Sequence, residues 1–222
     1  MSYSGYYQLN SNGTDLSGNS RHLTTAGTVV WTTAVFNYGM SVASGNNGLT
    51  VASNMGIVGG AATISMWYKP SSAPSFNYYG YMVSCTNTES DTGYDINYIN
   101  VSGQLRLMYR RYVQGGSPGT ENWIYYTYTL STSSWYHFGL TYDGSSIVRA
   151  FLNGARVASS ASNAGNGSGE TSGFGLGLHR SGVQNSAGIY DECIVDGTCW
   201  TESYMKNYYN QAVGRYAPKA RF

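Results

Sequence analysis

Few side chains in this sequence can perform acid–base or nucleophilic chemistry. Its 222 residues include five glutamates and three histidines, and charged residues make up only 10% of the chain. Asp191 and Glu192 are adjacent, so on a strand their carboxylates would point to opposite faces, whereas a retaining glycosidase needs them about 5–5.5 Å apart. No serine stands in a nucleophile elbow, and no Cys/His spacing fits a zinc site. The sequence therefore predicts a protein that is not an enzyme.

The segment Trp135–Ser160 is the densest group of reactive residue types, with a tryptophan, a histidine, an aspartate and two arginines. Large apolar and aromatic residues occupy every second position of Tyr136–Tyr142, which is the period of a half-buried strand. An Asp-Gly pair at 143–144 and an Asn-Gly pair at 153–154 are typical of tight hairpin turns. The pattern predicts scaffold rather than a site, with His137 as a hydrogen-bonded, partly buried side chain.

Two aromatic segments are better candidates for binding a ligand. A sugar site needs a flat ring for stacking and nearby polar groups that fix the orientation of the ligand. The segment Phe76–Tyr81 is rich in tyrosine, and Glu121–Tyr128 carries a tryptophan close to the basic segment Tyr109–Tyr112. Protein interfaces use the same residue types, and many of the 22 tyrosines must fill the core. The predicted ligand-binding residues are Tyr78, Tyr79, Tyr109, Arg110, Trp123 and Tyr125.

The elements that must position these side chains are mainly strands. Short β-branched and aromatic runs alternate with Gly/Asn/Ser clusters, and the chain has 29 glycines but only 4 prolines, a pattern typical of a sandwich. The one helix-like segment is Thr201–Gln211, for which Thr201 is a suitable N-cap. We expect one all-β domain over residues 1–210 and a basic tail over 211–222.

The net charge of only +1 argues against a nucleic-acid partner, because nucleic-acid-binding proteins carry clusters of basic residues. The segment Met1–Asn10 has neither a basic nor an apolar region of a signal peptide, and no window is apolar enough for a transmembrane helix. Three cysteines are an odd number for a disulfide framework. These features favour folding in a reducing compartment, with no membrane partner.

Four stretches together resemble the laminin-G-like (pentraxin-like) branch of the concanavalin A-like lectin/glucanase superfamily. Their order and spacing also fit, so the resemblance spans residues 6–210. It implies a two-sheet antiparallel jelly-roll sandwich with a short C-terminal helix, but domains of this kind have many functions. The four stretches are YYQLNSNGTDLSGNSRHL, TISMWYKP, WYHFGLTYDGSSIVRAFLNGARVAS and GIYDECIVDGTCWTESYMKNYYN.

The resemblance also allows two sites of other superfamily members, one catalytic and one for calcium, to be compared with this chain. Glucanases of the superfamily carry their catalytic carboxylates as Glu-x-Asp-x-Glu, and Glu89–Gly93 ends in glycine instead, which argues against glycoside hydrolysis. Some members bind calcium where the opening loop, here Asn10–Asn19, meets the closing strand. The matching ligands would be Asp15 and Asp191, and calcium prefers such oxygens. Alternatively, Asp15 caps a turn and Asp191 accepts backbone hydrogen bonds.

We therefore expect a non-catalytic recognition or assembly module. The missing secretion signal and the odd cysteine count favour a virus or phage particle component, such as a capsid decoration or fibre protein, with the ability to bind glycans. Its partners would be a glycan, other virion proteins or further copies of the chain, located in the virion or otherwise outside the cell. The alternative is a stand-alone carbohydrate-binding lectin domain, and a glycoside hydrolase is the least favoured interpretation.

Overall fold

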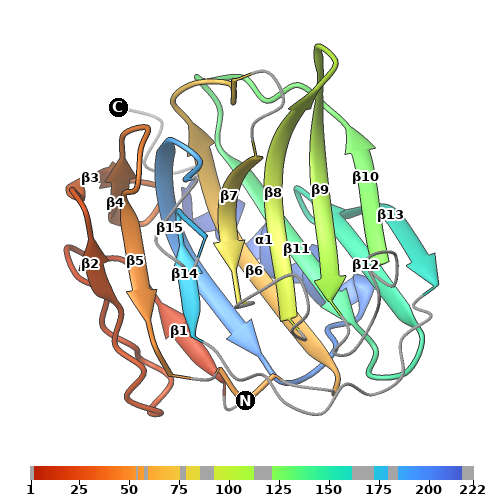
Figure 1. Ribbon diagram of the computed structural model, residues 1–222. Helices are drawn as coiled ribbons and strands as arrows, with labels where there is room; N and C mark the ends of the chain where they lie inside the picture. Colours follow the sequence, from red (N-terminus) through yellow and green to blue (C-terminus); the bar gives the residue numbers. More distant parts are fainter. Residues whose placement is uncertain are drawn as a thin grey trace.

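The computed structural model describes residues 3–53, 55–57, 60–75, 79–85, 93–112, 122–161, 173–179 and 185–216. At positions 110–112, 122–123, 161 and 216 the structure describes the backbone but not the side chains. Two antiparallel sheets stack face to face, and one helix lies behind them (Figure 1). The predicted all-β sandwich with a short C-terminal helix is confirmed.

The 7-stranded sheet faces the viewer in Figure 1, and the 8-stranded sheet lies behind it. The 7-stranded sheet has the order β10 (Asn122–Thr127), β9 (Gln104–Tyr112), β8 (Gly93–Val101), β7 (Tyr79–Ser84), β14 (Phe174–Leu176), β5 (Gly48–Val51) and β2 (Thr24–Ala26). The 8-stranded sheet has the order β13 (Ala155–Ala161), β12 (Ile147–Leu152), β11 (Tyr136–Tyr142), β6 (Ala62–Pro70), β15 (Gly188–Asp196), β4 (Asn37–Val42) and β3 (Val30–Ala34), and β1 (Gly5–Tyr7) also pairs with β15.

The segment Trp135–Ser160 forms the predicted scaffold. Tyr136, Phe138, Leu140 and Tyr142 of β11 point into the core between the sheets. The side chain of Asp143 accepts hydrogen bonds from three backbone N–H groups of the first turn. The second turn has positive φ at both central residues, 51° and 75°, as an Asn-Gly turn requires.

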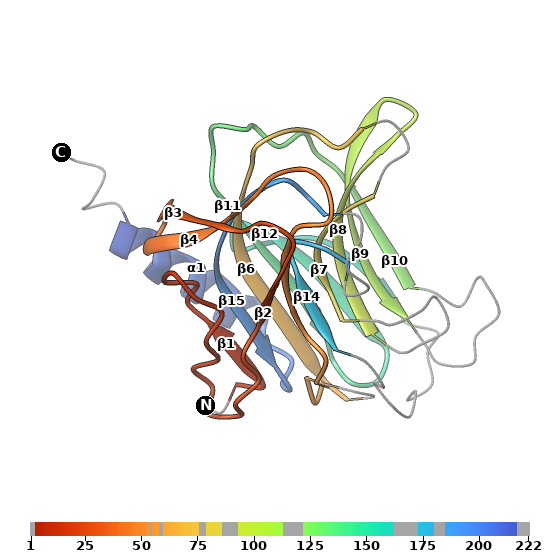
Figure 2. The same ribbon diagram turned by 60° about the vertical axis from the view of Figure 1, so that its left-hand side comes forward.

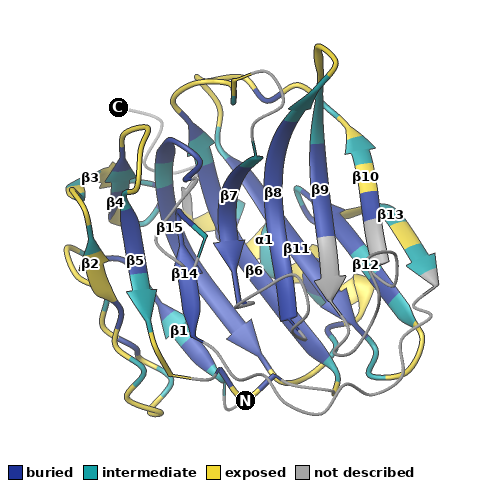
Figure 3. Cartoon of the chain, viewed as in Figure 1, coloured by how far each residue is buried: buried dark blue, intermediate teal, exposed yellow. Residues whose placement is uncertain are grey.

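Tyrosines fill much of the core between the two sheets. Seven of them are among the ten largest side chains that are fully buried, and Figure 3 shows that burial is concentrated in the central strands. Several of their hydroxyl groups bond to backbone: Tyr7 donates to the carbonyl of Arg21, and Tyr98 accepts from the N–H of Leu130. Eight of the 22 tyrosines are therefore buried in the core between the sheets, where a buried hydroxyl needs such a partner.

The helix α1 (Glu202–Tyr216) covers the outer face of the 8-stranded sheet, on the side away from β8–β10 (Figure 2). Thr201 is its N-cap, since its hydroxyl accepts the N–H of Tyr204 at 3.1 Å. Tyr209 stacks on Trp67 with ring centroids 5.6 Å apart. Gly139 of β11 faces the helix, and a Cβ added there would lie 2.6 Å from the end of Met205, so the flexible Met205 side chain would have to shift.

The helix extends through Tyr216, so the predicted boundary between the domain and a basic tail, at residue 210, falls inside it. Positions 217–222 lie outside the described residues. In the part of the chain that the structure describes, no helix has the length and apolar character that crossing a membrane requires.

Candidate functional site

The outer face of the 7-stranded sheet collects polar and aromatic side chains. Alternation along β8 places Tyr94, Ile96 and Tyr98 in the core, so Asp95 and Asn97 lie on the outer face. The strand register aligns Asn97 with Tyr81 of β7 on one side and with Met108 of β9 on the other, and Met108 aligns with Tyr125 of β10. One row across this face therefore reads Tyr81, Asn97, Met108 and Tyr125.

Asn97 is the most unusual side chain in this row. It is 0% exposed, and neither its amide nitrogen nor its amide oxygen has a hydrogen-bond partner among the described residues. Leaving a buried polar group without a partner costs about 1–3 kcal/mol. Such a group in a native fold often marks a functional position or a bound water.

The structure brings two of the six predicted ligand-binding residues, Tyr79 and Tyr125, to this outer face. Tyr125 is 42% exposed, and the guanidinium carbon of Arg106 lies 6.0 Å from the centre of its ring. Tyr79 is half-buried at the start of β7. The backbone register pairs Arg110 with Trp123, but their side chains are outside the description. Tyr78 lies outside the described residues.

Tyr109 differs from the other predicted residues because it belongs to the core. Its side chain is 0% exposed, and burial raises its pKa well above the ordinary value. Its hydroxyl donates to the carbonyl of Phe151 at 3.0 Å, which links β9 of one sheet to β12 of the other. The period of two in β9 points Tyr109 inward, whereas the prediction grouped it with its basic neighbours in sequence.

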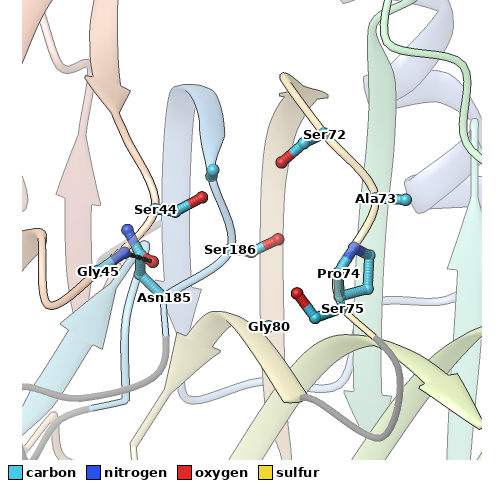
Figure 4. Close-up of a pocket in the computed structure, with 10 residues that line it drawn as sticks. Ser44, Gly45, Ser72, Ala73, Pro74, Ser75, Gly80, Asn185 and Ser186 are labelled. Atoms are coloured by element: carbon cyan, nitrogen blue, oxygen red, sulfur yellow. Dashed lines mark hydrogen bonds between the residues drawn. The ribbon is translucent and has the colours of Figure 1, made fainter.

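A polar pocket of about 120 Å³ opens beside β7, between the ends of the two sheets. Figure 4 shows the hydroxyl groups of Ser44, Ser72, Ser75 and Ser186 pointing toward one another across it. We call it the β7 pocket, and it is lined by Ser44, Gly45, Ser72, Ala73, Pro74, Ser75, Gly80, Asn185, Ser186 and Ala187.

Hydrogen bonds hold the wall of the β7 pocket in place. The amide of Asn185 accepts the N–H of Gly45 at 2.9 Å and donates to the carbonyl of Asn47 at 3.3 Å. The hydroxyl of Ser186 lies 2.8 Å from that of the buried Tyr68. The pocket is therefore fixed before any ligand arrives, which limits the entropic cost of binding.

Two tyrosine rings of β7 lie on the outer face of the sheet, and neither of them lines the β7 pocket. The rings of Tyr79 and Tyr81 are 6.5 Å apart, and His179 meets Tyr81 edge-on at 4.7 Å. Asn185 forms a backbone bridge with Tyr81, which ties the rings to the wall of the pocket. Sequence reasoning found Tyr79 but missed Asn185 and Ser186, because single small polar residues from separate loops carry no sequence signal.

The predicted calcium ligands both accept backbone hydrogen bonds. Asp15 accepts the N–H groups of Tyr6 and Arg21, at 3.0 Å each, and that of Ser17 at 2.9 Å. Asp191 accepts the N–H groups of Phe36 and Glu192, each at 2.8 Å. Within the described residues, no three acidic, histidine or cysteine side chains gather as a metal site would require.

Calcium binding at Asp15 and Asp191 stays a prediction, and a chelator tests it. If calcium binds the folded chain, EDTA should lower the melting temperature by a few degrees, because a ligand that binds only the native state stabilises it. Asp15→Asn should abolish that shift. An identical melting temperature with EDTA and with millimolar calcium would contradict the prediction.

The sequence model of the concanavalin A-like lectin/glucanases superfamily matches residues 43–201 of this chain. This span includes the β7 pocket and β7–β10. No curated protein sequence matches the chain.

Solved structures give the same architecture at low sequence identity. The binding domain of Paraclostridial Mosquitocidal Protein 1 is 18% identical, with a TM-score of 0.75 over 95% of this chain and 52% of that one. The binding domain of botulinum neurotoxin DC in complex with SialylT is 14% identical, with a TM-score of 0.73 over the same shares. This chain therefore spans about half the length of these two.

A third similar structure matches along nearly its whole length. It is domain 4 of AbnA, an extracellular GH43 arabinanase from Geobacillus stearothermophilus, in complex with arabinotriose. It is 17% identical, with a TM-score of 0.68 over 92% of this chain and 97% of that chain. At these identities the likeness concerns the fold.

Proposed function

The chain belongs to the concanavalin A-like lectin/glucanases superfamily, and from this premise we propose that it is a non-catalytic carbohydrate-binding module. Two observations carry the proposal: the pair of rings on the outer face of β7, Tyr79 and Tyr81, and the serine- and asparagine-lined β7 pocket, which Gly80 of the same strand also lines. The arabinotriose and SialylT complexes of similar folds add support.

The β7 pocket and the rings on the outer face of β7 each meet one of the two needs of a sugar site. Sugar hydroxyls require fixed donors and acceptors, and Asn185 and Ser186 are held in place by hydrogen bonds. The exposed hydroxyl groups of Ser44, Ser72 and Ser75 line the same pocket. The apolar face of a sugar ring requires an aromatic surface, and the half-buried Tyr79 supplies it. Tyr125, the exposed end of the row across the outer face, offers another ring for a further sugar residue.

The carboxylates support binding rather than hydrolysis. Asp95 is the one acidic residue in the described strands β7, β8, β9 and β10. A glycosidase of the usual kind needs two carboxyl groups on either side of the bond that it breaks. The proposed site therefore lacks the second group within these strands.

Replacing Tyr79 by alanine tests the proposed site. On a glycan array, we expect selective binding by the native chain and about fivefold weaker binding by Tyr79→Ala, because a stacked ring contributes on the order of 1 kcal/mol. Tyr79→Phe should retain most of the affinity, since it keeps the ring.

The matched control is Tyr38→Ala, which removes an exposed tyrosine from β4 in the other sheet. It should bind like the native chain. If Tyr79→Ala and Tyr38→Ala bound the array equally well, the site would have to be elsewhere.

An assembly role in a virus or phage particle stays a prediction. Its support is the odd cysteine count. Sedimentation of the purified chain checks it, because a particle protein of this kind should form a defined oligomer. A lone monomer at micromolar concentration would favour the stand-alone lectin alternative.

A further inference from the structure

A second cavity opens on the opposite side of the molecule from β8–β10, beside the C-terminal end of α1. Its volume is about 420 Å³. We call it the Glu192 cavity, and it is lined by Gln8, Asn10, Phe36, Asn37, Glu192 and Arg215. These residues come from the opening loop, the turn between β3 and β4, the strand β15 and the last turn of α1.

A chain of hydrogen bonds fixes the polar groups of the Glu192 cavity. Asn10 donates to the amide oxygen of Gln8 at 3.3 Å, and Gln8 donates to the hydroxyl of Tyr6 at 3.0 Å. Tyr6 donates to one carboxylate oxygen of Glu192 at 3.3 Å, and Tyr208 donates to the other at 2.8 Å. Each carboxylate oxygen keeps a further lone pair, and each amide keeps a further N–H.

The backbone is strained at two residues that line this cavity. Asn37 has φ of 105° and Glu192 has φ of 42°, conformations that L-residues rarely adopt. Glu192 lies in the β-bulge between Asp191 and Ile194, and bulges often re-aim a side chain next to a functional site. Strain of this kind is retained where it has a function.

The cavity combines an apolar wall with both signs of charge. The guanidinium carbon of Arg215 lies 5.1 Å from the centre of the Phe36 ring. Glu192, which is 4% exposed, lines the same space. Since a carboxylate and a guanidinium both face the cavity, neither a cation nor an anion would be favoured throughout it.

We propose that the Glu192 cavity is a second carbohydrate site, which binds one neutral sugar ring. The carboxylate of Glu192 and the amide oxygens accept sugar hydroxyls, while the amide N–H groups and Arg215 donate to sugar oxygens. Phe36 contacts the apolar face of the ring. The site goes beyond the proposed function because it is formed by other residues on the other sheet, and it would make a single chain bivalent.

Nuclear magnetic resonance of the isotope-labelled chain tests this proposal, with D-galactose, D-glucose, D-mannose, L-arabinose and N-acetyl-D-glucosamine as probes at millimolar concentrations. At least one probe should shift the side-chain amide signals of Gln8, Asn10 and Asn37 in a saturable way, with a millimolar Kd. Gln8→Ala should weaken that binding at least about fivefold, since it removes a donor and an acceptor. Glu192→Gln should weaken it similarly.

Gln211→Ala is the matched control, because Gln211 is exposed on α1 and does not line the cavity. It should leave the affinity unchanged. If no probe shifted the three amides, or if Gln8→Ala bound as the native chain does, the second site would be excluded. Signals of Gly45 and Ser186 report the β7 pocket separately, so the failure of one site is distinguishable from the failure of the other.

Discussion

Replacing Tyr109 by alanine is expected to lower the free energy of unfolding by about 3–5 kcal/mol, the range for removing a large buried aromatic side chain. The change leaves a cavity between the sheets and removes the hydroxyl that bonds to Phe151. Tyr109→Phe keeps the ring and should cost about 0.5–1.5 kcal/mol, the net contribution of one hydrogen bond. Urea denaturation measures both values.

Tyr125→Ala is the matched control for stability, because its ring is exposed on the next strand. It should change the free energy of unfolding by less than about 0.5 kcal/mol. If Tyr109→Ala lowered the free energy of unfolding by less than about 1 kcal/mol, the buried position of Tyr109 would be contradicted. Tyr109 would then again be a candidate ligand-binding residue.

The second large effect is expected in the pH dependence of stability. Burial raises the pKa of Asp191 from 3.8 to about 7, and the nearby Glu192 carboxylate adds to the shift, although the N–H groups of Phe36 and Glu192 oppose it. Because the native state keeps the proton of Asp191 to a higher pH than the unfolded state does, Asp191 contributes stability. This contribution is complete below about pH 4 and is lost as the pH rises through 7. The loss approaches about 1.4 kcal/mol per pH unit.

His137 has the opposite effect. Burial lowers its pKa from 6.5 to about 3, so its contribution is present above about pH 6.5 and is lost as the pH falls. Its Nε2 lies 2.8 Å from the hydroxyl of Ser65, consistent with a neutral ring. Between about pH 4 and 6.5 the two groups oppose one another, and the native chain should show a flattened profile.

Asp191→Asn should reveal the contribution of His137. The N–H groups of Phe36 and Glu192 bond to different oxygens of Asp191. Because asparagine keeps only one acceptor oxygen, one of these bonds is lost and the variant should be less stable than the native chain at about pH 4. From there to about pH 8 its stability relative to the native chain should rise by about 3–4 kcal/mol. Thermal or urea unfolding across this range measures the difference. A difference that did not change with pH would mean that Asp191 is ionised throughout.

The hairpin around β11 shows how far sequence patterns determine this fold. Alternation in Tyr136–Tyr142 and the two turn signals predicted its faces and its turns, because the strand period and positive φ are local properties. The N-cap at Thr201 was predictable for the same reason. The burial of His137 followed once its segment had been interpreted as scaffold.

The candidate site was less predictable because it depends on pairing between distant segments. Tyr79 and Tyr125 were chosen from local aromatic density, but only the strand register places both on one outer face. The same local criterion misplaced Tyr109, because sequence proximity to Arg110 does not mean that two strand residues share a face. Nothing local marks Asn185 or Ser186, whose role depends on a pocket formed by three loops.

The helix α1 makes the two broad faces of the sandwich inequivalent, and this decides how the chain should be attached to a surface. A tether joined after Tyr216 would leave from the helix side, away from β8–β10 (Figure 2). The β7 pocket and the rings on the outer face of β7 would then stay accessible, while the Glu192 cavity, which includes Arg215, would be crowded by the tether. Immobilisation in this orientation would therefore report on the first site almost alone.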